Sequence, residues 1–253
     1  MSERTNASFD WDSFNIDLYY KQYQDQVLPD DRILSRALIG ALLESEIPLR
    51  SLKTGIDACN GGLPIGPSLI APFIADTGKL YWSEYGKPQV SHAAKIIKMG
   101  REGNLGKFSA HQTHMAQCHP AWADAGFRAC TLGEAVQQSV FDLPADTYDI
   151  GITCFGPESL TGDYEEWRLA VETFLRSVHK GGPAAMLYTE NSNGYLAGMS
   201  YPAVSVDQAQ ILEAVQPELK QIHAGRIDPS HTARVDGDPH SYTGMGYVIG
   251  LKR

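Results

Sequence analysis

The chain is poor in basic residues. It has 21 lysines and arginines against 30 aspartates and glutamates, which gives a formal net charge of −9. Nucleic acids and anionic membranes are bound by basic faces, so we expect neither as the main partner. No apolar run approaches the roughly 20 residues that cross a bilayer. We expect a protein that acts on a small-molecule substrate, as a monomer or a homodimer.

Cysteine is also scarce. The four cysteines, at positions 59, 118, 130 and 154, lack the paired spacing of a disulfide framework. The first six residues are polar and lack the apolar core of a signal peptide. Both observations favour reduced thiols and a cytoplasmic location. With 43% apolar and 20% charged residues over 253 positions, the chain is expected to form one domain, residues 1–253, with a full core.

Strand-like and helix-like patterns alternate along most of the chain. A helix is expected to begin near Asp30 and Asp31, which are good helix caps. Strand and helix alternation predicts a doubly wound, mostly parallel α/β sheet. The last two strands have no helix between them and predict an antiparallel hairpin at one edge. The stretch 100–134 has no clear pattern. The seven expected strands are 54–58, 79–84, 134–140, 148–155, 184–188, 219–226 and 246–251.

Two of these strands end at an acid. The first ends with Asp57 and runs into a turn of small residues that includes Gly61, and the second ends at Glu84. In a parallel sheet such ends meet at the carboxyl edge, where ligands bind. A carboxylate accepts two hydrogen bonds side by side, which suits the two hydroxyls of a ribose. The two ends therefore predict a nucleoside site.

The turn decides between two kinds of nucleoside cofactor. A dinucleotide needs G-x-G-x-x-G to let its pyrophosphate approach a helix. The turn Cys59-Asn60-Gly61-Gly62 has two of these three positions wrong. S-adenosylmethionine (AdoMet) has no pyrophosphate and needs one close-approach glycine and the ribose acid. Gly61 and Glu84 meet that need, so AdoMet is the expected cofactor.

Six short segments follow one another along the chain, and none of them identifies a protein family by itself. They are Phe14-x4-Tyr19-x3-Tyr23, Asp57-x3-Gly61, Glu84-Tyr85-x3-Gln89, Ser139-Val140-Phe141-x-Leu143-Pro144, Thr153-x-Phe155-x2-Glu158-Ser159-Leu160-Thr161 and Asn191-Ser192-x2-Tyr195-x2-Gly198. Together they make the chain resemble the class I AdoMet-dependent methyltransferases over roughly residues 9–251. Within this class, the chain resembles more narrowly the group of the nicotinamide, phenylethanolamine and thioether methyltransferases. It implies a Rossmann-like seven-stranded core over residues 51–253 and an N-terminal helical lid over residues 1–50.

The resemblance also implies a cofactor site. Tyr19 and Tyr23 would close over the methionine part, and Glu84 would hold the ribose. Many relatives have glycine where Cys59 stands and aspartate where Ser139 stands. The full set of implied cofactor residues is Tyr19, Tyr23, Asp57, Asn60, Gly61, Glu84, Gln89, Ser139, Val140, Phe141, Thr153 and Phe155.

Methyl transfer needs a nucleophile held in line with the sulfonium. A general base is useful only when the acceptor arrives protonated. The implied catalytic residues are Tyr19, Glu190 and Tyr195, with Glu190 as the base and Glu158 as the second candidate. The implied substrate-binding residues are Tyr20, Glu158, Asn191, Ser192, Tyr195, Ser200 and Ser205.

Several alternatives stay open. Without an acceptor, the amino group of AdoMet can attack its own γ-carbon and yield azetidine-2-carboxylate and methylthioadenosine; some relatives are cyclases of this kind. A non-catalytic AdoMet-binding protein is the third possibility. The tyrosines near the start of the chain can also form an aromatic stripe that packs the N-terminal helix against the rest of the protein. The cluster His111, His114, Cys118 and His119 does not match a standard zinc spacing, so no metal is expected.

Overall fold

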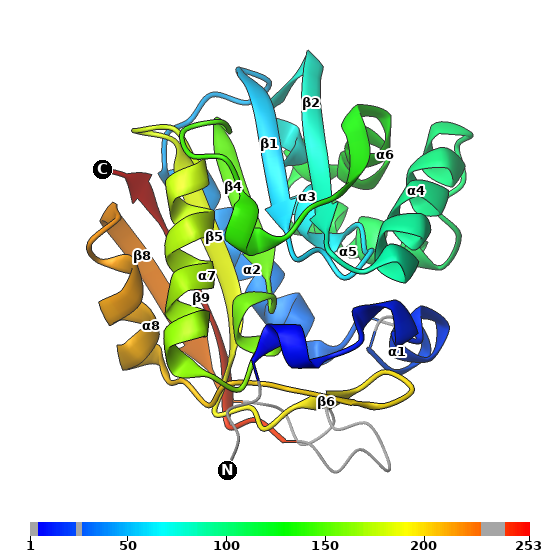
Figure 1. The fold of residues 1–253 in the computed structure, drawn as a ribbon. Coiled ribbons are helices and arrows are strands. Elements are labelled where there is room, and N and C mark those ends of the chain that lie inside the picture. Colours follow the sequence, from blue (N-terminus) through cyan, green and yellow to red (C-terminus); the bar gives the residue numbers. More distant parts are fainter. Residues whose placement is uncertain (1–4, 24–26, 229–240) are drawn as a thin grey trace.

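The carboxyl ends of a central sheet carry the residues of interest. The structure, a computed structural model, describes residues 5–23, 27–228 and 241–253. Its main sheet has seven strands in the order β3-β2-β1-β4-β5-β9-β8 (Figure 1). The strands are β1 Leu52–Ala58, β2 Ile74–Glu84, β3 Gly133–Gln137, β4 Ile150–Cys154, β5 Pro183–Glu190, β8 Leu219–Ile227 and β9 Gly244–Lys252.

Strands β1 to β5 pair in parallel, and β9 pairs antiparallel with β5 and with β8. This confirms the doubly wound sheet and the antiparallel edge hairpin. Two very short strands, β6 Tyr195–Leu196 and β7 Ser200–Tyr201, form a separate hairpin that the sequence pattern does not predict. A two-residue strand is too short to show an alternation of apolar and polar residues.

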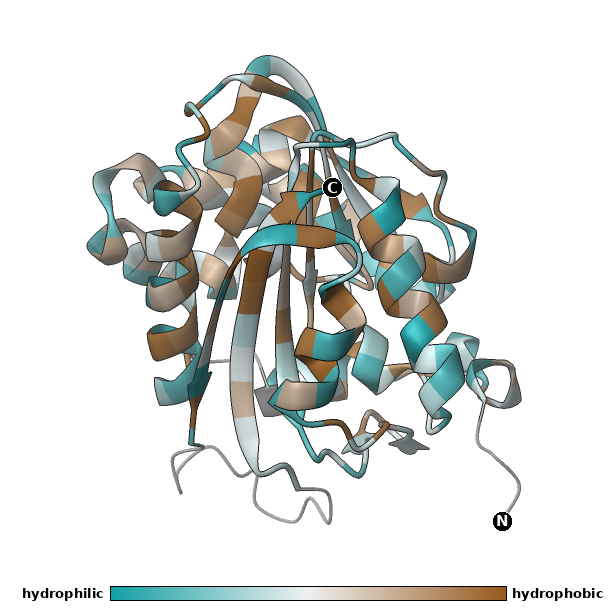
Figure 2. Cartoon of the chain, turned by 90° about the vertical axis from the view of Figure 1, so that its left-hand side faces the viewer, coloured by the Kyte–Doolittle hydropathy of each residue, from teal (hydrophilic) through white to brown (hydrophobic). Residues whose placement is uncertain are grey.

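Helices cover both faces of the sheet. They are α1 Ile16–Tyr23, α2 Pro29–Glu44, α3 Ile65–Ile70, α4 Lys87–Arg101, α5 Ser109–Cys118, α6 Ala125–Leu132, α7 Tyr164–Ser177 and α8 Gln208–Val215. One core lies under α7 and α8, and the other lies under α2 to α6. Figure 2 shows helices that carry both hydrophobic and hydrophilic residues, around strands in which hydrophobic residues alternate with hydrophilic and neutral ones. No helix among the described residues is long and apolar enough to cross a membrane.

The patternless stretch 100–134 contains α5 and α6. The buried face of α5 is formed by His111, His114 and Met115, so its helical period is carried by polar residue types. The buried residues of α6 are mostly small, including Gly126 and Ala129. Neither helix therefore shows the spacing of large apolar residues that marks an amphipathic helix.

The N-terminal part of the chain divides into two. Helix α2 packs against β8, β9 and α5, so it belongs to the helical layer of the core. The segment 5–23 instead lies across the carboxyl edge of the sheet (Figure 1). Of these two N-terminal parts, the segment 5–23 is the one that is placed to cover a site there.

Candidate active site

The first feature of the site is a carboxylate held against a turn. β1 and β2 run in parallel with Ala58 opposite Ser83, which sets Glu84 beside the turn that follows β1. The Glu84 carboxylate accepts a hydrogen bond from the Gly61 backbone N–H and, at 3.0 Å, one from the Tyr85 N–H. Burial raises the pKa of Glu84 to about 7, against the lowering effect of these two N–H groups. The structure thus brings the predicted pair together.

The turn itself has a left-handed backbone. Gly61 and Gly62 have φ of +65° and +74°, a region that favours glycine. A Cβ on Gly62 would lie 2.8 Å from the carbonyl oxygen of Gln89, which is buried in the first turn of α4. Cys59 also has a positive φ, +55°. The close packing of Gln89 on the turn gives this residue a structural role there.

Asp57 and Asn60 hold the turn from below. Asp57 Oδ2 accepts a 2.6 Å hydrogen bond from Asn60 Nδ2, which also donates to the Leu63 carbonyl at 2.6 Å. Asp57 is buried, and burial raises its pKa well above the usual range. Its second oxygen, Oδ1, has no hydrogen-bond partner among the described residues. Asp57 therefore orients the turn and keeps one acceptor oxygen available.

The end of β4 adds a second carboxyl group. Thr153 is fully buried opposite Ala58 of β1, and Phe155 has a positive φ of +58°. Glu158 follows and is also fully buried. Its Oε1 accepts the Thr189 N–H at 2.9 Å, while no partner is described for its Oε2. Burial raises the pKa of Glu158 to about 7.

Glu158 is not the cap of the next helix. Asp163 has that role, because its side chain accepts the Glu166 N–H at 2.7 Å at the start of α7. Glu158 is instead bonded to β5 through Thr189. Its buried carboxyl group therefore lies at the carboxyl edge of the sheet, where it is anchored to β5.

The predicted adenine residues follow β3. Their strand ends at Gln137, earlier than expected, because residues 140–142 form a 3-10 turn. Ser139 Oγ accepts the Phe141 N–H at 3.2 Å and so caps this turn. The Gln138 N–H donates to the Glu84 carbonyl at 2.8 Å, which holds the turn beside the end of β2. Val140 is buried in the core against α7, while Phe141 is partly exposed.

Aromatic rings cover the turn. We call the five rings of Trp11, Phe14, Tyr19, Tyr195 and Tyr201 the aromatic cover. Tyr195 stacks on Tyr201 with 5.5 Å between ring centroids, and Trp11 stacks on Tyr201 at 5.0 Å. Tyr19 meets Tyr195 edge-on at 5.9 Å. A Cβ on Gly61 would lie 3.9 Å from the Tyr19 ring, so this ring sits directly at the turn.

The N-terminal segment is fastened at both sides. The Asn6 N–H donates to Glu166 of α7 at 2.7 Å. Lys87 of α4 pairs with Asp12 at 2.6 Å. The segment therefore runs from α7 to α4 across the carboxyl edge.

Trp11→Ala should release this segment without unfolding the sheet, because Trp11 joins it to the β6–β7 hairpin by stacking and the sheet has its own cores. Aromatic pairs contribute about 0.5–1.5 kcal/mol beyond their buried area. Hydrogen exchange should speed up in residues 16–23 and stay slow in β4 and β5. Trp11→Phe keeps a ring and is the control. Equal exchange in α1 for both variants would contradict the stacking argument.

Both inner tyrosines are neutral phenols. Burial raises the pKa of Tyr195 well above its usual range, and the pKa of Tyr19 is also raised, by burial and then by Glu84, Asp31 and Glu158. A phenol held in its protonated form is a hydrogen-bond donor and an aromatic surface. It is not a base at neutral pH.

The remaining predicted residues divide by position. Tyr20 packs in the core, with its ring 5.1 Å from that of Phe108, so the substrate role expected for it does not fit. Ser192 is buried, whereas Asn191, Ser200 and Ser205 are exposed. Only the backbone of Tyr23 is described; its side chain lies outside the described part of the chain.

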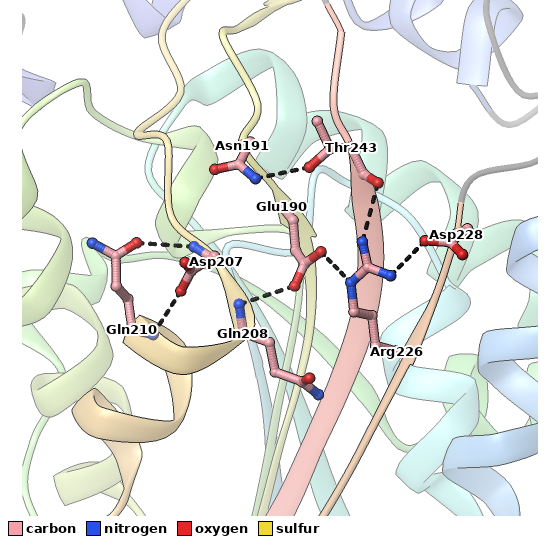
Figure 3. Close-up of polar contacts among 8 residues, drawn as sticks. All are labelled: Glu190, Asn191, Asp207, Gln208, Gln210, Arg226, Asp228 and Thr243. Atoms are coloured by element: carbon pink, nitrogen blue, oxygen red, sulfur yellow. Dashed lines mark hydrogen bonds and ion pairs between the residues drawn. The ribbon is translucent and has the colours of Figure 1, made fainter.

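Glu190 belongs to a different network (Figure 3). Its Oε2 accepts a 2.5 Å hydrogen bond from Arg226 Nε in an ion pair, and its Oε1 accepts the Gln208 N–H at 2.9 Å. Arg226 also pairs with Asp228 at 2.5 Å. Glu190 therefore joins β5 to β8 and to the start of α8. A carboxylate held in this way is a poor general base, which corrects the role expected for it.

From the sequence, Asp31 is expected only to cap a helix. It lies in the first turn of α2. Burial raises the pKa of Tyr19 and of the Cys154 thiol, and Asp31 is one of several carboxyl groups that add to both shifts. Burial raises its own pKa to about 7. The Oδ2 atom is buried without a described partner. An acid in the first turn of a helix is so common that it carries no signal for a site.

The histidines of α5 have other partners. His114 Nε2 lies 2.8 Å from Ser35 Oγ of α2 and 3.6 Å from Cys118 Sγ. Within the described ranges, no three histidine, cysteine or acidic side chains are grouped as metal ligands would be.

Solved structures share this fold. The N-methyltransferase NodS from Bradyrhizobium japonicum, in complex with S-adenosylhomocysteine, aligns with a TM-score of 0.53 at 12% identity, covering 90% of this chain and 89% of that one. An S-adenosylmethionine-dependent methyltransferase from Clostridium acetobutylicum aligns with a TM-score of 0.53 at 10% identity, covering 92% of this chain and 96% of that one. A methyltransferase from Aquifex aeolicus aligns with a TM-score of 0.50 at 13% identity, covering 96% of this chain and 100% of that one.

No protein-family model matches the sequence, and no curated protein matches it significantly. At these identities the likeness concerns the architecture alone. The strand order and the antiparallel β9 agree with it. The chain has the Rossmann-like methyltransferase fold.

Proposed function

We propose that the protein is an AdoMet-dependent methyltransferase with a small-molecule acceptor. The observation that carries this proposal is the buried Glu84 carboxylate against the Gly61 turn, on the methyltransferase fold. NodS, a structural neighbour, is in complex with S-adenosylhomocysteine at its own site. A solvated strand end would not hold a buried acid with a raised pKa.

The residues present fit such a cofactor. Each Glu84 oxygen accepts one described backbone hydrogen bond, and a carboxylate oxygen has room for a second, which suits the ribose hydroxyls. The free Oδ1 of Asp57 is an acceptor for an amino group. Tyr19 lies at the turn, where its ring would meet a sulfonium with a cation–π attraction of about 0.5–2 kcal/mol. When bound, AdoMet would supply the activated methyl group.

The protein's own contribution is positioning and exclusion of water. The aromatic cover closes the carboxyl edge, so that an acceptor would be held against the cofactor rather than exchange with solvent. Positioning of this kind supplies up to about 7–11 kcal/mol of a barrier. Glu158 is the general base that we propose, because its Oε2 is unoccupied and its pKa of about 7 suits proton transfer near neutral pH.

The products decide between methyl transfer and its alternatives. Full-length protein is incubated with AdoMet alone and with AdoMet plus a library of amines, alcohols and thiols, and the products are identified by mass spectrometry. S-adenosylhomocysteine that forms only with an acceptor is the expected result. Methylthioadenosine from AdoMet alone would instead establish a cyclase.

A binding measurement accompanies the product assay. At 100 times its dissociation constant, a ligand stabilises the folded state by about 2.7 kcal/mol. AdoMet should therefore raise the melting temperature. A rise without either product would indicate a binding protein, and no rise would refute the proposed cofactor.

A further inference from the structure

The chain between β5 and α8 is a loop that closes on itself. It covers residues 191–206, which we call the cover loop, and its two ends meet where the Asn191 N–H donates to the Val206 carbonyl at 2.8 Å. Within the loop, Tyr195 of β6 lies opposite Tyr201 of β7. Both rings belong to the aromatic cover. The position of these rings therefore depends on how the base of the loop is held.

One carboxylate lies at the base of the cover loop. Glu190 is the last residue of β5 and directly precedes the loop. Its Oε1 accepts the Gln208 N–H at 2.9 Å, at the start of α8 and just after the loop ends. The Glu190 backbone carbonyl accepts the Thr243 N–H at 2.8 Å, and the Asn191 side chain donates to Thr243 Oγ1 at 2.8 Å. The base of the loop is thus fastened to α8 and to the segment that leads into β9.

Arg226 holds this carboxylate from the edge strand β8 (Figure 3). Its Nε pairs with Glu190 Oε2 at 2.5 Å, and its Nη1 pairs with Asp228 at 2.5 Å. The Glu190 side chain is 4% exposed, whereas that of Asp228 is 83% exposed. A buried carboxylate that loses its cation is strongly destabilised, while an exposed ion pair contributes little. The pair between Glu190 and Arg226 is therefore the one that fixes the loop base.

The backbone of β9 is shaped around this pair. Gly244 of β9 lies opposite Glu190 of β5. A Cβ on Gly244 would overlap the Glu190 carboxylate and lie 2.9 Å from Arg226 Nη2. A larger residue at this position would displace the pair. The ion pair is therefore part of the sheet and not a chance contact between two surface side chains.

We propose that Glu190 and Arg226 are positioning residues, which set the cover loop, and with it the Tyr195 ring, over the cofactor site. This inference rests on the proposed function, because the cofactor site belongs to it. The Tyr195 ring meets the ring of Tyr19, which lies at the Gly61 turn. A shift at the base of the loop therefore reaches the cover above that turn. Both residues act through the loop and not by contact with the cofactor.

Hydrogen exchange of the ligand-free, full-length protein tests the loop directly. Glu190→Gln keeps an acceptor oxygen for the Gln208 N–H and loses the charge, whereas Arg226→Gln leaves the buried carboxylate without its cation. Both should speed exchange in peptides from residues 191–206 by about tenfold and leave peptides from β1 and β4 unchanged. Arg226→Lys keeps the charge and should exchange more slowly than Arg226→Gln. Wild-type exchange in the loop of both glutamine variants would overturn the proposal.

Lys252→Gln is the matched control. Lys252 pairs with Glu218 at 2.5 Å, and its side chain is 13% exposed. Because β9 runs antiparallel to β5, Lys252 lies near the amino end of β5 and Glu190 lies at its carboxyl end. The control variant should lower the stability to urea and leave exchange in the cover loop within about twofold of wild type. Equal acceleration of the loop in this variant would show a general loss of stability and overturn the positioning role.

The dissociation rate of S-adenosylhomocysteine tests the effect on the site. Tritiated compound bound to the protein is chased with unlabelled compound. The rate should rise about tenfold in Glu190→Gln and in Arg226→Gln, and stay within about twofold of wild type in Lys252→Gln. The double variant Glu190→Gln/Arg226→Gln should be no faster than the faster single variant, because both changes break one pair. Wild-type rates in both single variants would overturn the positioning role, even with faster exchange in the loop.

The two levels of proposal fail separately. If S-adenosylhomocysteine does not bind wild-type protein, the proposed function fails, and hydrogen exchange alone decides whether the pair holds the loop. If it binds and leaves all variants at one rate, only the positioning role fails.

Discussion

Glu84→Ala should weaken the binding of S-adenosylhomocysteine by about 100-fold or more. Hydrogen bonds to a charged group contribute about 1.5–3 kcal/mol each, and two ribose hydroxyls would lose their acceptor together. The effect should be specific, because Glu84 lies at the turn and makes no ion pair within the described ranges. Isothermal titration of the purified variant gives the affinity directly.

A second variant separates charge from local structure. Glu84 also accepts the Gly61 N–H, so its loss loosens the turn. Glu84→Gln keeps an acceptor oxygen for Gly61 but loses the charge, and it should bind more tightly than the alanine variant and more weakly than wild type. Circular dichroism and melting curves establish that both variants fold. A folded alanine variant with wild-type affinity would remove the ribose assignment.

The ligand-free protein should lose stability between about pH 5 and pH 7 and then level off. Burial raises the pKa of Glu84 and of Glu158 from 4.5 to about 7. As the pH rises above 4.5, these groups ionise in the unfolded chain while the folded protein still holds their protons, so unfolding is favoured. Above pH 7 both states are ionised, and the loss is complete. Such a difference is about 3 kcal/mol for each group.

Urea unfolding at pH 5, 6, 7 and 8 measures this loss. Other groups titrate in the same range, so the comparison is with a Glu84→Gln/Glu158→Gln double variant that lacks the two ionisations. Its stability should fall less between pH 5 and pH 7 than that of wild type. Parallel stability curves for the two proteins would show that these carboxyl groups are solvated in the folded state.

Much of the sheet could be predicted because β4, β5 and β9 are largely apolar, buried runs that are bounded by turns. The acid at the end of β2 and the small-residue turn after β1 identified the edge that matters, since parallel strands end together. The helices α5 and α6 could not be predicted, because histidines and small residues fill their buried faces. A local sequence pattern shows only the types of residue, whereas the burial of a residue depends on which other elements pack against it.

The site was less predictable for a physical reason. Glu158 and Glu190 both follow strands of the sheet, and sequence cannot show that Arg226, far along the chain, neutralises only the second. Asp31 is distant from the turn in sequence and is brought near Tyr19 by the packing of α2. Charge pairing and long-range proximity are properties of the fold, so the choice of base required the structure.

The fastening of the N-terminal segment has a consequence for access to the site. A strap anchored at two sides cannot swing away as a free arm; it can only bow outward or release one anchor. At the Asp12–Lys87 anchor an exposed ion pair, which salt screens, adds to a 3.2 Å hydrogen bond from the Lys87 backbone N–H. The Asn6 anchor consists of hydrogen bonds to Glu166 and to the Leu160 carbonyl and depends less on ionic strength. Rising salt would therefore open the entrance from the α4 side first.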